Sequence, residues 1–267
     1  MQIALFIVFF VLGTAFGSFL CCQARRLRYH ETHKKSDRLG SRSVCLHCHY
    51  QLKWYDNLPL LSWLALKGKC RKCHKSIGLA EFLSELFTGL AFLGLAVSYN
   101  LNLDTPPLVW LEFVLMLTLA LLLIFLAIYD GLYGELPSLY LTFSIICAII
   151  IATLREWANF SSLENLYAHL ADLLFAVAIL GGLYLILYKF SHGKWVGDGD
   201  WLLGTSLGLA LGTPWLALIA LFLANFTACL AALPAIKSRP KIYFGPFLVF
   251  AFFITQIFSV FFNSLML

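Results

Sequence analysis

Charged residues are scarce in this chain. Lysine, arginine, aspartate and glutamate make up only 12% of its 267 residues, whereas hydrophobic residues make up 61%. A soluble domain is excluded, because ordinary soluble domains are about half apolar and about a quarter charged. The alternating segments of roughly ten residues that mark an outer-membrane barrel are also lacking. Continuous apolar runs of about 17–25 residues are present instead, and this length crosses a bilayer as a helix.

Basic residues are absent before the first apolar run, 3–20, and three arginines follow it: Arg25, Arg26 and Arg28. A secretory signal has the reverse order, and no convincing small-residue cleavage site follows the run. We therefore expect residues 1–20 to form an uncleaved first transmembrane helix whose carboxyl end is cytoplasmic.

Seven further apolar runs predict an all-α polytopic membrane protein with about eight transmembrane helices. These runs lie at residues 79–97, 108–128, 136–154, 170–188, 200–211, 214–233 and 244–262. The run at 200–211 is short for a full crossing. With the N-terminus outside, the segments on the cytoplasmic side are 21–78, 129–135, 189–199 and 234–243.

The distribution of basic residues supports this topology. Thirteen of the 19 lysines and arginines lie in 21–78, five lie in the other cytoplasmic segments, and only Arg155 falls outside. Lysine and arginine near the ends of spans favour the cytoplasmic side. Topology and contact with anionic lipid headgroups explain the basic loop better than binding of nucleic acid does. We thus expect three parts: the first helix (1–20), a basic cytoplasmic loop (21–78) and a transmembrane core (79–267).

Two C-x-x-C pairs lie in that loop, Cys45 with Cys48 and Cys70 with Cys73. Two such pairs about twenty residues apart are typical of a tetrahedral four-cysteine zinc site, which has no open position for water and is structural. The alternatives are free thiols, or disulfides, which the reducing cytoplasm disfavours. Neighbouring histidines can also replace a sulfur ligand: His47, His49 and His74.

Two aspartates stand out at the ends of predicted spans. Asp130 directly follows the third span, and Asp200 begins the sixth in the sequence KWVGDGDW. The predicted topology brings both to the cytoplasmic boundary of the membrane, where an acid is costly unless it is paired or hydrated. Each is next to a glycine, Gly131 or Gly199, which lets backbone or substrate approach closely. These features make the two aspartates candidates for function.

Residue chemistry alone leaves three uses of these acids open. Each can be an interfacial side chain that is solvated or bonded to a neighbouring helix. The two carboxyls can instead share a proton, so that one takes a proton from water while the other hydrogen-bonds a scissile carbonyl. They can also bind a divalent cation, with Asp198 and Glu135 as further oxygen ligands. Of the two functional uses, the aspartyl dyad is favoured.

Several motifs occur in a specific order along nearly the whole chain. They are FGSFL at 16–20, the double C-x-x-C loop, SELFTG at 84–89, YDGLYGELPSLYLT at 129–142, GDGD at 197–200 and FGPFL at 244–248. In this set the chain resembles the type IV prepilin peptidases, bacterial inner-membrane aspartyl proteases with a Gly-x-Gly-Asp motif. The motif alone is a weak signal, whereas the ordered set is specific.

The resemblance implies that Asp130 and Asp200 are the catalytic pair and that Asp198 occupies a variable position. The motif glycines that support the pair are Gly131, Gly197 and Gly199. It also implies a multi-pass enzyme of the bacterial cytoplasmic (inner) membrane that cuts on the cytoplasmic side. The substrates are type IV prepilins or pseudopilins, whose short basic leader is removed after a glycine.

A second activity is implied by the resemblance alone. Many members methylate the new N-terminal amine with S-adenosylmethionine, and Glu81 and Glu85 are candidates for holding the methyl acceptor. No glycine-rich methyltransferase fingerprint on a Rossmann unit is present. The chain departs from the family pattern at Cys21-Cys22-Gln23, Leu46, Ser138 and Leu202. No catalytic acid is lost, but the changes in the first motif weaken the implication of methyl transfer.

Two other functions compete with this interpretation. A presenilin-like intramembrane protease also uses Tyr-Asp and Gly-x-Gly-Asp, but the cysteine loop and the early basic segment argue against it. A zinc-bearing membrane scaffold or transporter would use the acids for ions. Many transporters contain internal repeats, and no clear repeat is found here.

Overall fold

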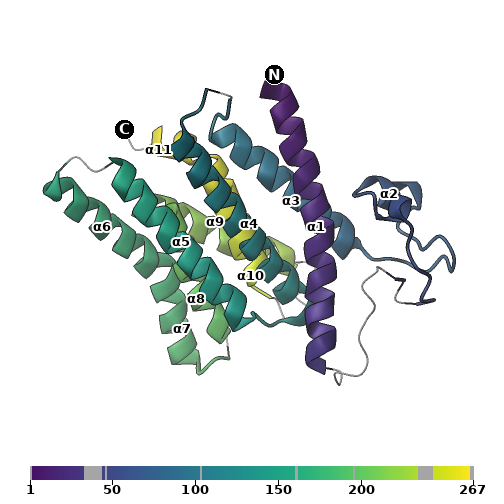
Figure 1. Ribbon diagram of the computed structural model, residues 1–267. Coiled ribbons are helices and arrows are strands. Elements are labelled where there is room, and N and C mark those ends of the chain that lie inside the picture. Colours follow the sequence, from purple (N-terminus) through teal and green to yellow (C-terminus); the bar gives the residue numbers. More distant parts are fainter. Residues whose placement is uncertain are drawn as a thin grey trace. The chain divides into compact units, whose positions relative to one another are not determined.

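The computed structural model describes residues 2–32, 44–45, 47–102, 104–159, 162–194, 196–233 and 243–264. In these ranges the chain forms helices and no strand (Figure 1), so the predicted all-α fold class is confirmed. The structure divides into two compact units, Met1–Ala96 and Val97–Leu267. Parts of two predicted cytoplasmic segments, 33–43 and 234–242, lie outside the described residues together with their basic side chains.

The first unit consists of long helices joined by a segment that carries the four cysteines. Its elements are α1 (Gln2–Thr32), a 3-10 turn (Trp54–Asn57), α2 (Leu61–Ala65) and α3 (Leu79–Ser98). Helix α1 is longer than the predicted 1–20, because no glycine or proline interrupts residues 21–32. The two arginines at 25 and 26 therefore lie on the helix itself.

Glycines let α1 and α3 pack backbone to backbone. A Cβ atom on Gly13 would lie 2.6 Å from the carbonyl oxygen of Thr88, and one on Gly17 would lie 2.5 Å from that of Ser84. Such close approach through small residues is the usual packing of membrane helices, since lipid supplies no hydrophobic force between them. The FGSFL motif thus has a packing role through Gly17.

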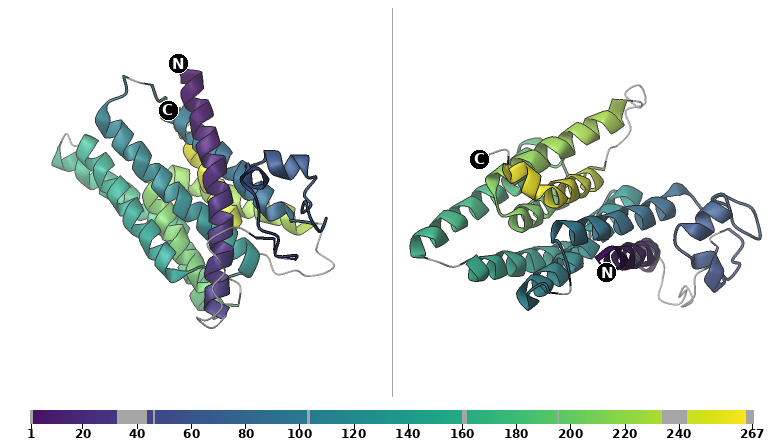
Figure 2. Two further views of the ribbon diagram at one scale, coloured as in Figure 1. Left: turned by 45° about the vertical axis from the view of Figure 1, so that its right-hand side comes forward. Right: turned by 90° about the horizontal axis from the view of Figure 1, so that it is seen from above.

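The second unit is a bundle around α8. Its elements are α4 (Pro107–Tyr133), α5 (Ser138–Asn159), α6 (Leu163–Val177), the π-helical η2 (Ala178–Gly182), α7 (Leu183–Ser191), α8 (Asp198–Leu211), α9 (Pro214–Ala232), α10 (Gly245–Ile257) and α11 (Ser259–Ser264). Helices α5, α6, α7, α9 and α10 all contact α8. Figure 2 shows this bundle from two further sides.

Six helices of the described chain are long and apolar enough to cross a membrane: α1, α3, α4, α5, the continuous Leu163–Ser191 and α9. The two other predicted spans are short helices. α8 has 14 residues and α10 has 13, which corresponds to about 21 Å and 20 Å, less than the roughly 30 Å of a bilayer core. Because nine of its residues are buried, α8 is enclosed by the other helices.

Close packing of η2 against α8 also depends on glycine. A Cβ atom on Gly204 would clash with the carbonyl oxygen of Leu180 in η2, and one on Gly208 would lie 2.8 Å from that of Ala176 at the end of α6. The middle of α8 is therefore held against the backbone of η2 and of the last turn of α6.

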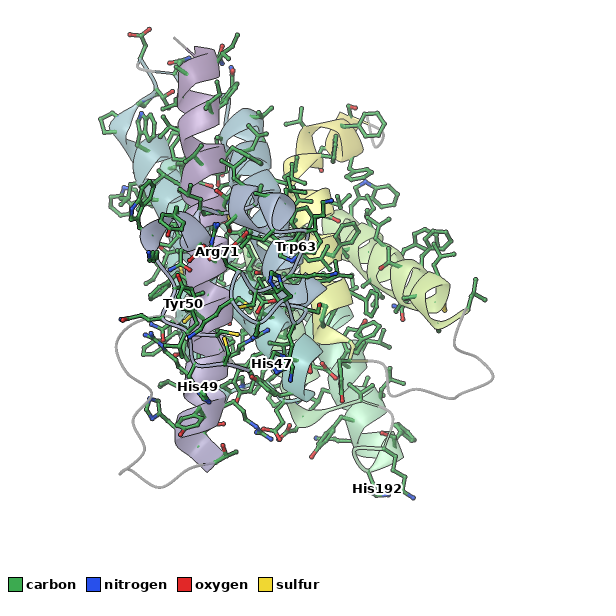
Figure 3. All side chains as sticks on the ribbon, turned by 90° about the vertical axis from the view of Figure 1, so that its right-hand side faces the viewer. His47, His49, Tyr50, Trp63, Arg71 and His192 are labelled. Carbon is green, nitrogen blue, oxygen red and sulfur yellow. The ribbon has the colours of Figure 1, made fainter. Side chains whose placement is uncertain are left out.

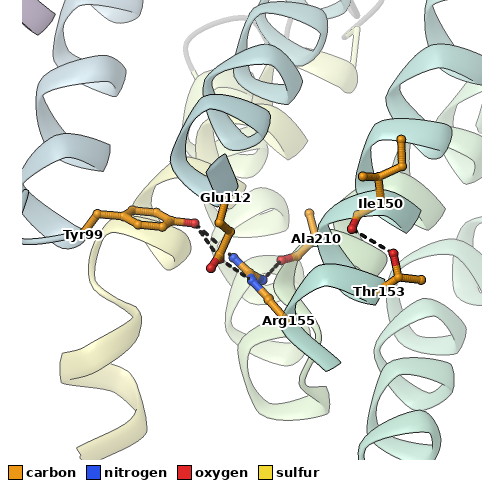
Figure 4. A network of polar contacts seen from close by, with 6 residues as sticks. All are labelled: Tyr99, Glu112, Ile150, Thr153, Arg155 and Ala210. Carbon is orange, nitrogen blue, oxygen red and sulfur yellow. Dashed lines mark hydrogen bonds and ion pairs between the residues drawn. The ribbon is translucent and has the colours of Figure 1, made fainter. Parts of the chain in front are cut away.

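The carboxyl end of α8 is fixed by a polar network (Figure 4). Arg155 on α5 donates from Nη1 to the carbonyl oxygen of Ala210 at 2.6 Å. Its Nε pairs with Glu112 on α4 at 2.7 Å, and the Tyr99 hydroxyl donates to the same carboxylate at 2.9 Å. The guanidinium thus satisfies a helix-terminal carbonyl. One arginine, the only basic residue predicted outside, joins α4, α5 and α8.

We predict that Gly208→Ala lowers the apparent midpoint of thermal unfolding. Overpacking costs about 1–3 kcal/mol, and the atoms that a new Cβ meets here are backbone atoms of Ala176 and Val177. The matched control is Gly182→Ala, whose Cβ meets nothing closer than 3.8 Å. Removing a helical glycine there should stabilise by up to about 1 kcal/mol. Circular dichroism of both purified variants in detergent measures the midpoints, and equal stabilisation of both would contradict the packing.

Candidate active site and metal centre

Asp130 lies in the last turn of α4 and is 6% exposed. The helix ends because Gly134 adopts a left-handed conformation with φ +70° and donates its N–H to the carbonyl oxygen of Asp130 at 2.7 Å. The Asp130 side chain accepts a hydrogen bond at Oδ2 from the N–H of Gly245, 2.9 Å away. Gly245 is the first residue of α10, so this carboxyl lies at a helix N-terminus, where negative charge is favoured.

Asp200 lies in the first turn of α8 and is 8% exposed. Its Oδ2 accepts a hydrogen bond at 2.9 Å from the N–H of Gly197, the residue that caps the helix. This is the usual way in which an acid three residues after a cap satisfies a terminal N–H. Asp198 is exposed. The structure therefore separates the two aspartates of GDGD, with only Asp200 inside the bundle.

The structure brings Asp130 and Asp200 together, although 70 positions separate them. Helix α10 contacts both α4 and α8. Leu136, just after α4, covers Gly199, where a Cβ would lie 2.7 Å from that of the leucine. The carboxyls are close enough for the charge of Asp200 to act on Asp130. Two buried acids whose charges interact, each held by a main-chain N–H, can share a proton.

Gly245 is a site residue to which the sequence analysis gives no role. A Cβ at this position would lie 2.7 Å from Asp130 Oδ2, so any side chain would displace the carboxyl. The Gly-Pro pair of FGPFL is the signal that could have found it. Proline in the first turn marks a helix start, and the N–H groups of a first turn have no partner within the helix.

The four cysteines gather into one cluster in the first unit. Their sulfur atoms all lie within 4.8 Å of one another, with Cys45 and Cys73 at 3.9 Å and Cys48 and Cys70 at 3.9 Å. Tetrahedral zinc with bonds of about 2.3 Å needs sulfur atoms about 3.8 Å apart, so these residues fit the ion. All four are free cysteines. The cluster can therefore hold a metal, and the disulfide alternative is not observed in the described residues.

Each C-x-x-C pair forms the same small turn. Bridges join Val44 to Gln51 and Lys69 to Ser76 on either side of the pairs. Main-chain N–H groups of Cys73 and Lys72 hydrogen-bond the Cys70 sulfur and lower the pKa of its thiol to about 7. A thiolate is the form that binds a metal. The neighbouring histidines, two of them labelled in Figure 3, are not members of the cluster in the described residues.

A buried acid ties the two cysteine turns together. Asp56 is 9% exposed and pairs with Arg71 Nε at 2.7 Å, and it also accepts the N–H of Lys53 at 3.1 Å. The Arg71 guanidinium lies over the ring of Tyr55, 5.0 Å from its centre. Arg71 stands between the second pair of cysteines, so this contact fixes that turn to the segment that follows the first pair.

The two predicted glutamates of α3 have different surroundings. Glu81 is half-buried, and its Oε1 pairs with Arg25 of α1 at 2.6 Å. Glu85 is 7% exposed, and its Oε2 accepts the N–H of Leu60 at 2.7 Å. Both therefore belong to the first unit, beside the cysteine-bearing segment.

Comparison with known proteins shows the family to which this chain belongs. The prepilin leader peptidase/N-methyltransferase of Vibrio cholerae is 30% identical over 231 residues, which cover 84% of this chain and 85% of that protein. The chain belongs to the prepilin leader peptidase/N-methyltransferase family. The resemblance predicted from the ordered motifs is thereby confirmed.

Further matches agree with this family assignment. The family model of the bacterial peptidase A24 N-terminal domain matches residues 11–99. A prepilin leader peptidase/N-methyltransferase of Bacillus subtilis is 28% identical, and the alignment covers 87% of this chain and 84% of that protein. For the relative from Myxococcus xanthus, the identity is 39% over 39% of this chain and 30% of that protein. No solved structure matches the chain.

We predict that the purified protein carries about one zinc ion, the number that one tetrahedral four-cysteine site holds. The double variant Cys45→Ser/Cys70→Ser should lose it, because two of four sulfur ligands are replaced. Cys229→Ser is the matched control, since this exposed cysteine lies on α9 outside the cluster. Plasma mass spectrometry gives the metal content. A metal-free wild type, or a double variant that keeps its ion, would contradict the site.

Proposed function

We propose that this chain is a membrane aspartic endopeptidase that cleaves the basic leader from type IV prepilins or pseudopilins, after a glycine. The observation that supports it most is the burial of Asp130 and Asp200 together, from two helices far apart in sequence. A scaffold has no need for such a pair, because each buried carboxyl costs free energy. The relatives carry the name prepilin leader peptidase/N-methyltransferase.

In the proposed reaction the two acids share one proton. The ionised carboxylate takes a proton from a water molecule, whose oxygen attacks the scissile carbonyl carbon. The other, protonated, carboxyl donates a hydrogen bond to the carbonyl oxygen and stabilises the charge that develops there. When the C–N bond breaks, the dyad returns a proton to the leaving amine. The main-chain donors Gly245 and Gly197 hold the Oδ2 atom of each acid, which leaves the other oxygens for water and substrate.

The proposed site lies at the cytoplasmic face of the bacterial inner membrane, with the N-terminus outside. Six apolar helices support a multi-pass protein, and the excess of basic residues in 21–78 supports this orientation. The substrate is itself an apolar helix with a basic leader. It can approach laterally through lipid and present its leader at the level of the two acids.

The first unit has a separate task in this proposal. The four cysteines hold a structural zinc ion that cross-links the cytoplasmic loop, since such loops have little core of their own. The second half of the relatives' name, N-methyltransferase, supports transfer of a methyl group to the new N-terminal amine, with S-adenosylmethionine as donor. Glu81 and Glu85 are the candidates for the acceptor site. The proposal also divides the chain into a first helix (1–20), a cytoplasmic loop (21–78) and a transmembrane core (79–267).

We predict that Asp130→Asn and Asp200→Asn each reduce leader cleavage at least about 100-fold, the lower end of what general acid–base groups contribute. Asp198→Asn is the matched control and should cleave at the wild-type rate, because Asp198 is exposed although it lies only two residues before Asp200. A purified prepilin in detergent is the substrate, and mass spectrometry follows the loss of the leader.

The thermal unfolding midpoint of each variant is measured as well, so that loss of cleavage through unfolding is distinguished from loss of a catalytic group. Full processing by either Asn variant would refute the dyad. Equal loss in the Asp198 variant would show that charge at this turn, rather than the buried pair, carries the activity.

A further inference from the structure

Tyr184 of α7 is a buried tyrosine to which the proposed proteolysis assigns no role. The residue is 3% exposed, and its hydroxyl oxygen is buried without a hydrogen-bond partner in the part of the chain that the structure describes. A buried tyrosine hydroxyl usually finds a partner, because an unpaired one loses the hydrogen bonds that water would give it. The groups around this hydroxyl therefore have to explain why it is kept.

The register between α8 and the helix before it brings this tyrosine level with one of the two acids. Two glycines of α8 lie against main-chain carbonyl groups of that helix: Gly208 against Ala176, and Gly204 against Leu180. Each step of four residues forward along the one helix is thus matched by a step of four residues back along the other, the pattern of an antiparallel pair. The next pair in this series is Tyr184 and Asp200, and α7 contacts α8.

Two further observations place the hydroxyl at the candidate active site. The charge of Asp200 acts on the Tyr184 hydroxyl, which requires the two groups to lie near each other. The Tyr184 ring also packs on that of Phe244, with ring centres 5.4 Å apart. Phe244 directly precedes Gly245, whose N–H holds Asp130. Tyr184 therefore packs beside the main-chain donor of one acid and lies near the carboxyl of the other.

Asn225 of α9 also lies near the hydroxyl of Tyr184. Its amide nitrogen donates to the carbonyl oxygen of Leu221 at 2.8 Å, and no hydrogen bond joins the two side chains. The hydroxyl hydrogen thus has no acceptor in the described residues. Asp200 offers one, because its Oδ2 accepts the N–H of Gly197 and its other oxygen is left for water and substrate.

A water molecule is the group that can connect this hydroxyl with the carboxyl. The two side chains lie near each other but are not hydrogen-bonded, and polar groups in that arrangement are often bridged by water. A buried water molecule makes about three hydrogen bonds to groups that lack other partners. Here it would accept one hydrogen bond from the tyrosine and donate another to the carboxylate.

We propose that Tyr184 is a third catalytic residue of the aspartyl site, whose hydroxyl holds the attacking water against Asp200. The inference rests on the proposed function, from which it takes the reaction. The water accepts the hydroxyl hydrogen of Tyr184 and gives one of its own protons to Asp200, so that a lone pair faces the scissile carbonyl carbon. Asp130 is then the protonated acid that hydrogen-bonds the carbonyl oxygen. Tyr184 keeps its proton throughout, and no bond to it forms or breaks.

Cleavage kinetics of the full-length Tyr184→Phe variant test this role, with a purified prepilin in detergent as substrate. We expect kcat to fall at least about tenfold, because the water loses one of the two contacts that orient it. KM should change less than about twofold, because the hydroxyl does not bind the prepilin itself. The thermal unfolding midpoint should equal or exceed that of the wild type, since phenylalanine leaves no buried hydroxyl unpaired.

Tyr167→Phe is the matched control, because this tyrosine of α6 is 70% exposed and the same change there should leave the kinetics at wild-type values. An undiminished kcat in Tyr184→Phe would overturn the inference, as would an equal loss in the control. A loss of activity together with a lower unfolding midpoint would also overturn it, because the hydroxyl would then be a structural partner, for example of Asn225. Wild-type cleavage in the same preparation separates the two levels. If the wild type cleaves and Tyr184→Phe matches it, this inference alone fails, whereas a wild type without cleavage refutes the proposed function.

Discussion

Two carboxyl groups inside an apolar bundle are the constraint on which the second unit depends. Lipid and aliphatic side chains give an acid no hydrogen bond, so the bundle must supply N–H groups at the right places. It does so with the starts of two helices. The N-terminus of α10 meets Asp130, and the cap of α8 meets Asp200. Glycine is required at Gly245 because Asp130 lies where a side chain would begin.

Contacts with the neighbouring helices of the second unit hold α8 in place. It is shorter than a membrane span, and its surroundings hold it at three levels. Asp200 joins its first turn to its own cap, glycines let its middle pack against α6 and η2, and Arg155 binds the carbonyl oxygen of Ala210 near its end. A helix fixed in this way holds its acid at a constant position. Precision at the site therefore depends on residues along the whole length of α8.

The long helices and the two aspartates of the candidate site could be predicted from the sequence. Apolar runs locate the long helices because lipid demands length and hydropathy, and both are local properties. The same criteria predicted α8 as a membrane span although it is short, because a helix enclosed by protein is also apolar. The pairing of Asp130 with Asp200 was suggested by topology and motif. Gly245 was not predicted. The Gly-Pro pair of FGPFL marks a helix start, but only the meeting of α4 and α10 shows that this start binds Asp130.

The contrast between Glu81 and Glu85 makes the same point for the first unit. Four positions apart on one helix, they look equivalent in sequence, but Glu81 pairs with Arg25 whereas Glu85 accepts the N–H of Leu60. The π turn η2 has a consequence of its own for the helix that contains it. It adds one residue to a turn, so the helical phase of residues after 182 is shifted by about 100° relative to those before 178. The continuous helix from 163 to 191 thus presents two different stripes of side chains. The loss of a single residue in η2 would rotate Tyr184 and the rest of α7 into another register.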